Sequence, residues 1–482
     1  MIYASKRRKK NTHTFAYVRK KSYLCGQIET IMKKFFTLLA LCLCMAGYAA
    51  TVTGTLPVVY INTANGQAID SKETYLTAGI YIDPLQTGYA ALGSSAAPVT
   101  ALVKGRGNWT WSAFDKKPYR IKFDAKQKVL GMPKDKHWVL LAGADDPLGC
   151  LKNPAGFLLS EAVGLRWTPR TVPVELVLNG AYQGLYFLTE HVRVGSNRVN
   201  IQELPDNSVD ADSITGGWLV EIDNYWSENN IEFNEGNGQH MMVSLKEPEV
   251  LSSVQRQYIM HQMGLLNSAL YDYTSALASL MDLDEAAKYY LVQEIMEDCE
   301  SYHGSCFLYK DRDSLGIVDP WKFGPVWDFG NAYNRHEERW IYDGPTFAQY
   351  WIGQLATWPA FQKKVKEQWY IFYHAQKDEV RAAIRAFADR IETASKNDAA
   401  VWRGTQNYCD NSNYADVRDR FFRRYDWRIG WLYSQWGEGI EPEVEGLPVT
   451  GYGLRVEKVL RDGQLYIIRG GQTYTIQGQI VK

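Results

Sequence analysis

Three acidic residues in the second half of the chain have the type and spacing that metal binding or phosphoryl transfer requires. Asp298 and Glu300 end or follow a segment with helical periodicity, DLDEAAKYYLVQEIMED. Acidic side chains at the C-terminal end of a helix interact unfavourably with the helix dipole, so a structural role explains them poorly. Asp328 comes 28 residues after Glu300, in the stretch GPVWDFGNAYNR. We interpret these residues as candidate ligands or bases; ordinary solvent-exposed acids are the alternative.

Phosphoryl transfer would give each of these acids a role. One carboxylate must hold the magnesium that bridges the phosphates, and another must orient or deprotonate the attacking hydroxyl. Magnesium takes oxygen ligands and keeps several waters, so two or three carboxyl groups are sufficient. We assign Asp328 to the metal, Glu300 to the hydroxyl, and Asp298 to either role. Trp327 and Phe329, which flank Asp328, are expected to be core residues.

The first half of the chain supplies candidates for binding phosphate. KGRGNWTW places Arg106 between two glycines, a composition suited to anion binding by side chains and free backbone amides. In the alternating segment KKPYRIKFD, Lys122 lies on the face opposite Ile121. Glu161, in the predicted helix KNPAGFLLSEAVG, is a candidate partner for Lys122. The alternative is that Lys122, a single lysine on a strand, simply lies on a solvent-exposed face of the sheet.

The pattern of elements indicates an α+β protein with a β-rich half followed by a helical half. Short alternating segments run from residue 51 to about 205, and they include a hairpin with Asn179 and Gly180 at its turn. The predicted helix at 152–164 stops at a glycine. Helical periodicity dominates after residue 250, with Ser252 as a predicted N-cap. We place the boundary between the halves near residue 245.

The N-terminus has the layout of a secretory signal peptide. Met32 opens MKKFFTLLALCLCMAGYAA, which is a lysine pair, a short apolar run and a small-residue end. We therefore expect translation to start at Met32, cleavage near Ala49 or Ala50, and an exported chain without a transmembrane helix. The four remaining cysteines show no zinc spacing and are either disulfide-bonded or buried thiols. A net charge of −1 does not favour nucleic acid as a partner.

The C-terminal residues 438–482 are expected to form a separate element. EPEVEGLP reads as a linker, and the alternating residues that follow contain two glycine-centred turns. This short β tail is similar to the sorting or surface-attachment segments of Bacteroidetes-like proteins. An edge hairpin without a sorting role is the alternative.

Five ordered blocks of sequence, between about residues 95 and 335, resemble the CotH family of exported, atypical protein kinases, the spore coat protein H type. The blocks are RGN-W…KKPYRIKFD, LLAGADD…N, VELVLNGAYQGLYFLTEHV, GGWLVEIDN and FLYKD…WDFG. The resemblance implies a divergent two-lobed protein-kinase-like domain over residues 101–437, preceded by a β-rich segment at 51–100. It further implies ATP and a divalent metal, Mg²⁺ or Mn²⁺, bound between the lobes.

The resemblance also implies roles for individual residues. Asp328 matches the metal-binding aspartate of the family. The stretch DCESY stands where the family has N-x-D-G-Y, so Glu300 takes the place of an aspartate and Asp298 that of an asparagine. Ser305 stands where a kinase catalytic loop has an asparagine. These departures affect the expected activity more than the expected fold, because even a small displacement of a catalytic group lowers the reaction rate.

Three functions are consistent with these residues. The first is an exported kinase that transfers the γ-phosphate of ATP to a serine, threonine or tyrosine hydroxyl of an unidentified protein; its location would be periplasmic, cell-surface or secreted. The second is a catalytically weakened binding or scaffold protein with a surface glycan or protein as its partner. In that case tryptophans of the helical half could line a sugar-binding face, and packing in the helix core is the alternative use for most of them; the candidates are Trp340, Trp351, Trp358 and Trp369. The third is hydrolysis by the carboxylates of Glu300 and Asp328.

Overall fold

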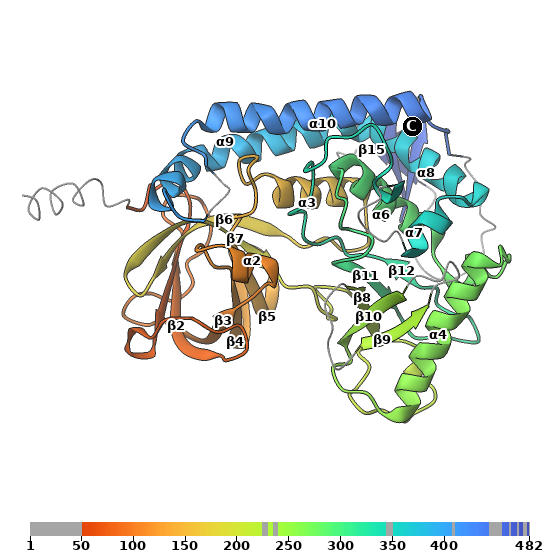
Figure 1. Cartoon of the computed structure of the whole chain (residues 1–482), viewed down its shortest axis with the longest axis horizontal. Coiled ribbons are helices and arrows are strands. Elements are labelled where there is room, and N and C mark those ends of the chain that lie inside the picture. Colours follow the sequence, from red (N-terminus) through yellow and green to blue (C-terminus); the bar gives the residue numbers. More distant parts are fainter. Residues whose placement is uncertain are drawn as a thin grey trace, which may run out of the picture. The chain divides into compact units, whose positions relative to one another are not determined.

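A closed seven-stranded barrel forms the first half of the protein in the computed structural model (Figure 1). The structure describes residues 51–223, 230–234, 240–343, 350–406 and 410–442 and the strand segments 456–461, 464–469, 472–475 and 480–481. The order around the barrel is β1-β2-β3-β4-β5-β7-β6, and a parallel β1–β6 pair closes it. The strands are β1 Val58–Thr63, β2 Leu76–Asp83, β3 Val99–Gly105, β4 Tyr119–Val129, β5 Met132–Leu141, β6 Thr171–Leu178 and β7 Ala181–Glu190.

Side chains alternate along the barrel strands, so that successive residues face the inside and the outside of the barrel. Val103, Ile121 and Trp138, on three neighbouring strands, are at most 1% exposed and belong to one apolar cluster. Their neighbours Lys104 and Arg120 lie on the other face of the strands and are partly exposed. The predicted hairpin is confirmed: Asn179 and Gly180 join β6 to β7 with φ values of 50° and 79°.

A second, five-stranded sheet lies beside the barrel (Figure 1). Its order is β12-β11-β8-β10-β9, and all neighbours are antiparallel. The strands are β8 Trp218–Ile222, β9 Asn230–Asn234, β10 His240–Glu247, β11 Cys306–Lys310 and β12 Lys322–Phe323. Residue 245, the predicted boundary between the halves, lies within β10, and the sheet takes strands from both sides of that position.

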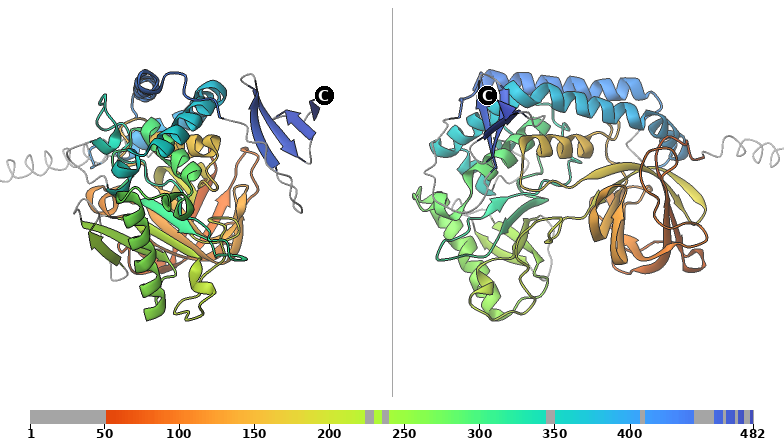
Figure 2. Two further views of the ribbon diagram at one scale, coloured as in Figure 1. Left: turned by 90° about the vertical axis from the view of Figure 1, so that its right-hand side faces the viewer. Right: turned by 180° about the vertical axis from the view of Figure 1, so that it is seen from behind.

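Helices dominate the chain after β10, as predicted. They are α4 Ser253–Tyr271, α5 Leu277–Leu280, α6 Leu283–Met296, α7 Tyr350–Leu355, α8 Pro359–Ile371, the π-helical η4 Phe372–Gln376, α9 Lys377–Val401 and α10 Tyr414–Trp436. Ser252 accepts a hydrogen bond from the Gln255 amide, which confirms it as the N-cap of α4. The long helices α9 and α10 run side by side (Figure 2).

One helix of the first half, α3 (Lys152–Val163), connects the two parts of the structure. It packs against α6 and α9. It ends at Gly164, whose left-handed φ of 82° confirms the predicted stop. A short helix, α2 (Trp109–Ala113), lies between β3 and β4. The mixed α+β class is therefore as predicted, whereas the closure of the first half into a barrel was not.

Several smaller predictions have definite outcomes. Cys150, Cys299 and Cys306 are buried free thiols, and Cys409 lies outside the described residues, as does the predicted signal peptide at 1–50. The four described strand segments near the C-terminus form an antiparallel sheet; they are β13 Val456–Arg461, β14 Gln464–Arg469, β15 Gln472–Thr475 and β16 Ile480–Val481. Within the described residues, no helix has both the length and the apolar character needed to cross a bilayer.

Candidate functional site

The turn that carries Asp328 is held by the first turn of α3. Asp328 has a left-handed φ of 57° and is exposed, whereas its neighbours Trp327 and Phe329 are 7% and 0% exposed. The Phe329 amide donates to Asn153 Oδ1 at 3.0 Å, and Lys152 Nζ donates to the Gly330 carbonyl at 2.9 Å. These bonds present the Asp328 carboxylate to solvent while the two aromatic side chains lie in the core.

Close packing against α3 fixes the two aromatic rings. The Phe157 ring lies 5.9 Å from the Trp327 ring and 6.0 Å from the Phe329 ring, centre to centre. A Cβ atom on Gly156 would lie 2.2 Å from the Phe329 ring, so no larger residue fits at that point without a shift. The expected core role of Trp327 and Phe329 therefore agrees with their packing.

Asp145, which follows β5, brings a second carboxylate to the same place. A Cβ atom on Gly330 would lie 2.5 Å from Asp145 Oδ2 and 3.3 Å from Asp328 Oδ1, so both carboxylates approach one point. Burial raises the pKa of Asp145 to about 6, and the charge of Asp328 contributes. Two carboxylates without a cation between them repel each other, and this repulsion is the second largest cause of the shift.

Asp145 and Asp328 line a hollow of about 400 Å³, a volume that includes the part open to solvent. The residues that line it come from the segment between β3 and β4 (which includes α2), the end of β5 and the loop after it, the start of α3 and the Asp328 turn: Arg106, Thr110, Pro118, Leu141, Ala142, Gly143, Ala144, Asp145, Asn153, Trp327 and Asp328. The Arg106 guanidinium lies 5.6 Å from the centre of the Trp327 ring. Burial lowers the pKa of Arg106, and the charge of Asp328 acts in the opposite direction.

Asp298 and Glu300 leave the end of α6 and extend the acidic cluster. Asp298 is fully buried, and its Oδ2 atom has no hydrogen-bond partner in the described part of the chain. Burial raises the pKa of Asp298 well above its usual range, and the charges of Glu300 and Asp328 raise it further. Burial and the charge of Asp328 likewise raise the pKa of Glu300 to about 7. The Asn331 amide donates a hydrogen bond to Glu300 Oε2.

The structure therefore brings four of the six predicted site residues together and leaves two apart. Arg106, Asp298 and Glu300 all surround Asp328 closely enough for mutual electrostatic effects. Lys122 and Glu161 are both exposed, and no ion pair joins these two described residues. Lys122 lies opposite His137 on the outside of β4, while Glu161 is on the solvent side of α3. Their assigned role in phosphate binding stays a prediction.

Sequence reasoning missed Asp145 as a site residue. The motif LLAGADD places two acids after an apolar strand, and such a pair is equally typical of a turn. In the structure the second acid, Asp146, accepts hydrogen bonds from the amides of Leu148 (2.7 Å) and Lys152 (2.8 Å). These bonds hold the start of α3, which leaves the first acid, Asp145, for the hollow.

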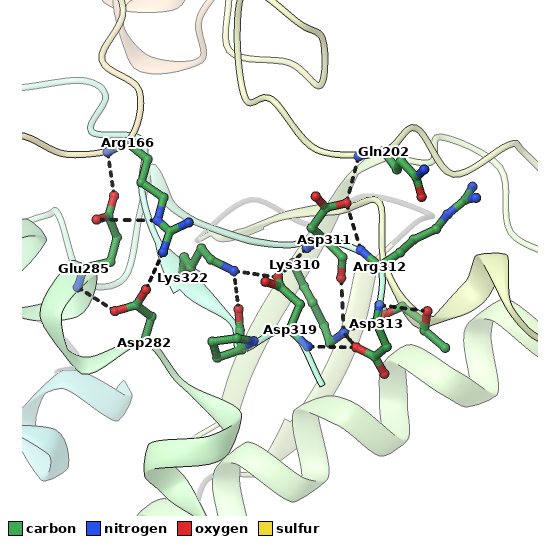
Figure 3. A network of polar contacts seen from close by, with 12 residues as sticks. Arg166, Gln202, Asp282, Glu285, Lys310, Asp311, Arg312, Asp313, Asp319 and Lys322 are labelled. Carbon is green, nitrogen blue, oxygen red and sulfur yellow. Dashed lines mark hydrogen bonds and ion pairs between the residues drawn. The ribbon is translucent and has the colours of Figure 1, made fainter. Parts of the chain in front are cut away.

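A polar network fixes the β11–β12 hairpin that leads to Asp328 (Figure 3). Lys310 Nζ donates to the Thr215 carbonyl at 2.6 Å, and Lys322 Nζ donates to the Pro320 carbonyl at 2.7 Å. Each lysine also pairs with an aspartate of the hairpin, Lys310 with Asp313 and Lys322 with Asp319. These bonds neutralise both buried lysines and hold the strand that enters the site.

The donor set fits a divalent cation that also binds phosphate. The described residues contain no group of three or more histidine, cysteine or acidic side chains placed to hold a metal ion on their own. Magnesium is usually held by one or two carboxylates together with water and substrate phosphates. Asp145 and Asp328 supply two such carboxylates. A cation would reduce the repulsion between them and would compensate the Asp298 oxygen that has no hydrogen-bond partner.

A comparison with protein-family models finds a match. The family model described as CotH kinase protein matches residues 103–426, which include the barrel strands from β4 onward, the second sheet and every residue of the acidic cluster. No curated protein matches this sequence. Since the match covers well over half of the sequence, the chain belongs to the CotH kinase protein family.

Proposed function

We propose that this protein is an ATP-dependent protein kinase with a divergent, two-lobed kinase-like architecture. The observation that supports this most strongly is the meeting of Asp145 and Asp328 at Gly330, in a hollow that also contains Arg106. Carboxylates for a metal beside a cation for phosphate form the combination that phosphoryl transfer needs. In this proposal the barrel and the helical part of the chain are the two lobes, and nucleotide binds between them.

Asp145 and Asp328 would hold Mg²⁺ or Mn²⁺. When bound, such an ion neutralises charge on the phosphate oxygens of the nucleotide. Arg106 would contact the phosphates from the barrel side, with its guanidinium supported by the Trp327 ring. The first turn of α3 keeps the Asp328 carboxylate in position through Asn153 and Lys152.

Glu300 would orient the acceptor hydroxyl and take its proton. Its pKa of about 7 suits a general base that works near neutral pH. Asp298 would act on Glu300 as a positioning residue, because its Oδ1 accepts a hydrogen bond from the Glu300 amide at 3.4 Å. The Asn331 amide, bonded to Glu300 Oε2, would fix the direction of the carboxylate.

Transfer of labelled γ-phosphate from ATP to exported proteins, or to the protein itself, tests this function. The comparison is between the wild type and the variants Glu300→Gln and Asp328→Asn. We expect Mn²⁺- or Mg²⁺-dependent transfer that falls by at least ~100-fold in both variants. Glu300→Gln should retain nucleotide binding and Asp328→Asn should lose its metal-dependent part. Transfer that survives in both variants would contradict the assigned roles.

Export is a further part of the proposal, based on the signal-peptide pattern that begins at Met32. N-terminal sequencing of the protein from its native host should find a mature end near Ala50. An intact N-terminus in the cytoplasmic fraction would contradict export.

A second candidate is a kinase-related binding protein at the cell surface. It is favoured by one observation, the separation of Lys122 from Glu161, which leaves unformed the strand–helix ion pair expected for a kinase. Of the tryptophans considered for sugar binding, Trp351 and Trp369 are buried, and Trp340 and Trp358 are partly buried. Nucleotide binding without measurable phosphate transfer to any acceptor would support this candidate.

A further inference from the structure

The loop between β11 and β12 ends in a tight turn that exposes three aliphatic side chains. Leu315 is 100% exposed, Ile317 is 72% exposed and Val318 is 51% exposed. Ser314 and Ile317 exchange two backbone hydrogen bonds, of 3.0 and 2.9 Å, so that Leu315 and Gly316 form a two-residue turn. We call the stretch from Ser314 to Val318 the apolar tip. Adjacent apolar side chains with this much exposure mark an interaction site, whereas single ones are ordinary.

The turn itself does not require a leucine. Leu315 and Gly316 have φ values of 53° and 77°. Asn179 and Gly180, which join β6 to β7, have nearly the same values, 50° and 79°. Asparagine followed by glycine is the preferred pair for such a turn, and a leucine is strained there because its Cβ atom crowds the following carbonyl oxygen. Since Leu315 is fully exposed, no packing within the chain compensates this strain.

The polar network of Figure 3 fixes the base of the apolar tip. Asp313 Oδ1 accepts a hydrogen bond from the Asp319 amide at 3.0 Å, and Asp319 Oδ2 accepts one from the Asp311 amide at 2.8 Å, so the two arms of the loop are joined. Lys310 pairs with Asp313, and Lys322 pairs with Asp319. Because both carboxylates are neutralised within the protein, the tip can approach a surface of low dielectric without bringing unpaired acids to it.

One cation beside the apolar tip has no acid bonded to it. Arg312 Nη2 donates to the Glu203 carbonyl at 2.9 Å, and Arg312 Nε is buried without a hydrogen-bond partner in the described part of the chain. The charge of Arg312 acts on the exposed carboxylate of Asp210, but these two described residues form no ion pair. A guanidinium matches the oxygens of a phosphate group in two-point contacts. Aliphatic side chains beside such a cation match the two layers of a membrane surface, hydrocarbon and phosphate.

The size and composition of the apolar tip favour a lipid surface over a protein partner. A stable protein interface buries about 800 Å² on each side. Three aliphatic side chains supply only roughly 200–300 Å². The residues that dominate the binding energy of protein interfaces are enriched in tryptophan, tyrosine and arginine, whereas leucine and valine are under-represented. The hydrocarbon of a bilayer is fluid, so it encloses a protruding tip without a complementary shape.

We propose that the apolar tip inserts into the surface of a lipid bilayer, with Arg312 in contact with a lipid phosphate. Leu315, Ile317 and Val318 would enter the hydrocarbon, and the polar network would stay outside it. Binding through three aliphatic side chains is weak and reversible, comparable to that of a single acyl chain, about 10⁴ M⁻¹. The proposal does not depend on the kinase function. It gives the protein a membrane contact that needs no spanning helix.

Flotation with lipid vesicles tests the proposal, using vesicles of phosphatidylcholine alone and vesicles that also contain phosphatidylglycerol. The chain from Thr51 onward is used, because residues 52–482 form one compact unit and the apolar residues 35–44 could bind lipid by themselves. We expect the wild type to bind both vesicles. Leu315→Asn should weaken binding to both by about 10-fold or more, since one apolar side chain no longer enters the hydrocarbon. Leu315→Met keeps an apolar side chain and should bind as the wild type does.

Two further variants separate the tip from general effects of charge and strain. Arg312→Gln should weaken binding to the vesicles with phosphatidylglycerol by about fivefold, because one cation near the anionic surface is lost. Leu85→Asn is the matched control for Leu315→Asn. Leu85 also has a left-handed φ, 49°, and is 37% exposed, but it lies in the barrel loop after β2, so its replacement should leave vesicle binding unchanged. The melting temperature of Leu315→Asn should equal or exceed that of the wild type, since asparagine accepts the left-handed φ.

Three results would overturn the membrane contact. The first is a wild type that binds neither kind of vesicle, and the second is a loss of binding in Leu85→Asn as large as that in Leu315→Asn. The third is a wild type that sediments as a dimer while Leu315→Asn sediments as a monomer, because a second copy of the chain then covers the tip. Binding of ATP should be the same in Leu315→Asn and in the wild type, so failure of this proposal leaves the kinase function untouched.

Discussion

Buried charges in the supporting helices and buried charges at the candidate site are neutralised to very different extents. Lys116 and Asp398, which join the barrel to α9, are fully buried and lie 2.8 Å apart. Arg428 of α10 is equally buried and pairs with Glu294 of α6. At the site, by contrast, Asp298 is fully buried with one carboxylate oxygen unpartnered.

The difference shows which charges serve the fold and which serve a ligand. A buried ion pair whose hydrogen bonds are satisfied holds elements together, and breaking it leaves an uncompensated charge. Acids that raise one another's pKa values destabilise the protein that contains them. Such a cluster is expected where a cation or an anion from outside completes the charge balance.

The strongest test of this comparison makes the same substitution in both places. Asp398→Asn keeps an acceptor for the Leu185 amide but leaves Lys116 buried without a counter-charge. We expect it to cost ~3–5 kcal/mol of stability, whereas Asp328→Asn should cost nothing or stabilise the metal-free protein. Thermal melting of both variants measures the difference. Equal destabilisation by the two substitutions would show that the site charges are structural.

A methyl group at Gly330 probes the point where the two carboxylates meet. Gly330→Ala places a Cβ atom 2.5 Å from Asp145 Oδ2, so that carboxylate must move. We expect Mn²⁺ affinity in the presence of ATP to fall by ~10–100-fold, the usual cost of disturbing the surroundings of a metal site. Gly195→Ala is the control, because its Cβ atom would meet nothing within 4 Å. Equal affinities in the two variants would place the metal elsewhere.

The raised carboxyl pKa values predict a pH dependence. Asp145, with a pKa of about 6, must be deprotonated when a cation binds, so Mn²⁺ affinity should fall ~10-fold or more between pH 7 and pH 5. Glu300, with a pKa of about 7, titrates in the same range. The metal-free protein should behave oppositely. Because the folded state binds these protons more tightly than the unfolded state, its stability should decrease as pH rises from about 4.5 to about 7.

Titration by calorimetry at several pH values measures the affinity, and melting curves measure the stability. In Asp328→Asn the loss of stability between these pH values should be smaller, because the charge of Asp328 is one cause of both pKa shifts. If Asp328→Asn leaves the pH profile unchanged, the charge of Asp328 does not contribute to the pKa values of Asp145 and Glu300.

The smallest expected effect is at an exposed ion pair. Arg381 bonds both carboxylate oxygens of Asp426 at 2.8 Å, but the two side chains are 44% and 47% exposed. Water and salt screen such a pair, so Asp426→Asn should cost less than ~1 kcal/mol. The same melting experiment measures this loss of stability. A loss as large as that of Asp398→Asn would show that burial does not explain the difference between the two ion pairs.

Local features of the fold were predictable from sequence, and its closure was not. Asn179 and Gly180 identified a hairpin because few residues accept a left-handed φ at two successive positions. The parallel pairing of Val58 with Glu175, which closes the barrel, joins segments far apart in the sequence. No local pattern encodes such a pairing, because alternation fixes which face a residue takes but not which strand lies beside it.

The same limit applies to the site. Asp298, Glu300 and Asp328 were recognisable because acids are unfavourable at a helix end or between core aromatics. Asp145 was not, since only the structure shows that Asp146 holds the start of α3 and leaves its neighbour free.

Calorimetric binding of ATP with and without Mg²⁺ or Mn²⁺, to the wild type and to Asp328→Asn, tests most directly whether the acidic cluster is a metal–nucleotide site. We predict metal-dependent binding to the wild type and the loss of that dependence in the variant. Binding that needs no metal, or that the substitution leaves unchanged, would contradict the assignment of Asp328 to the metal. Absence of binding under every metal condition would contradict the proposed kinase function itself.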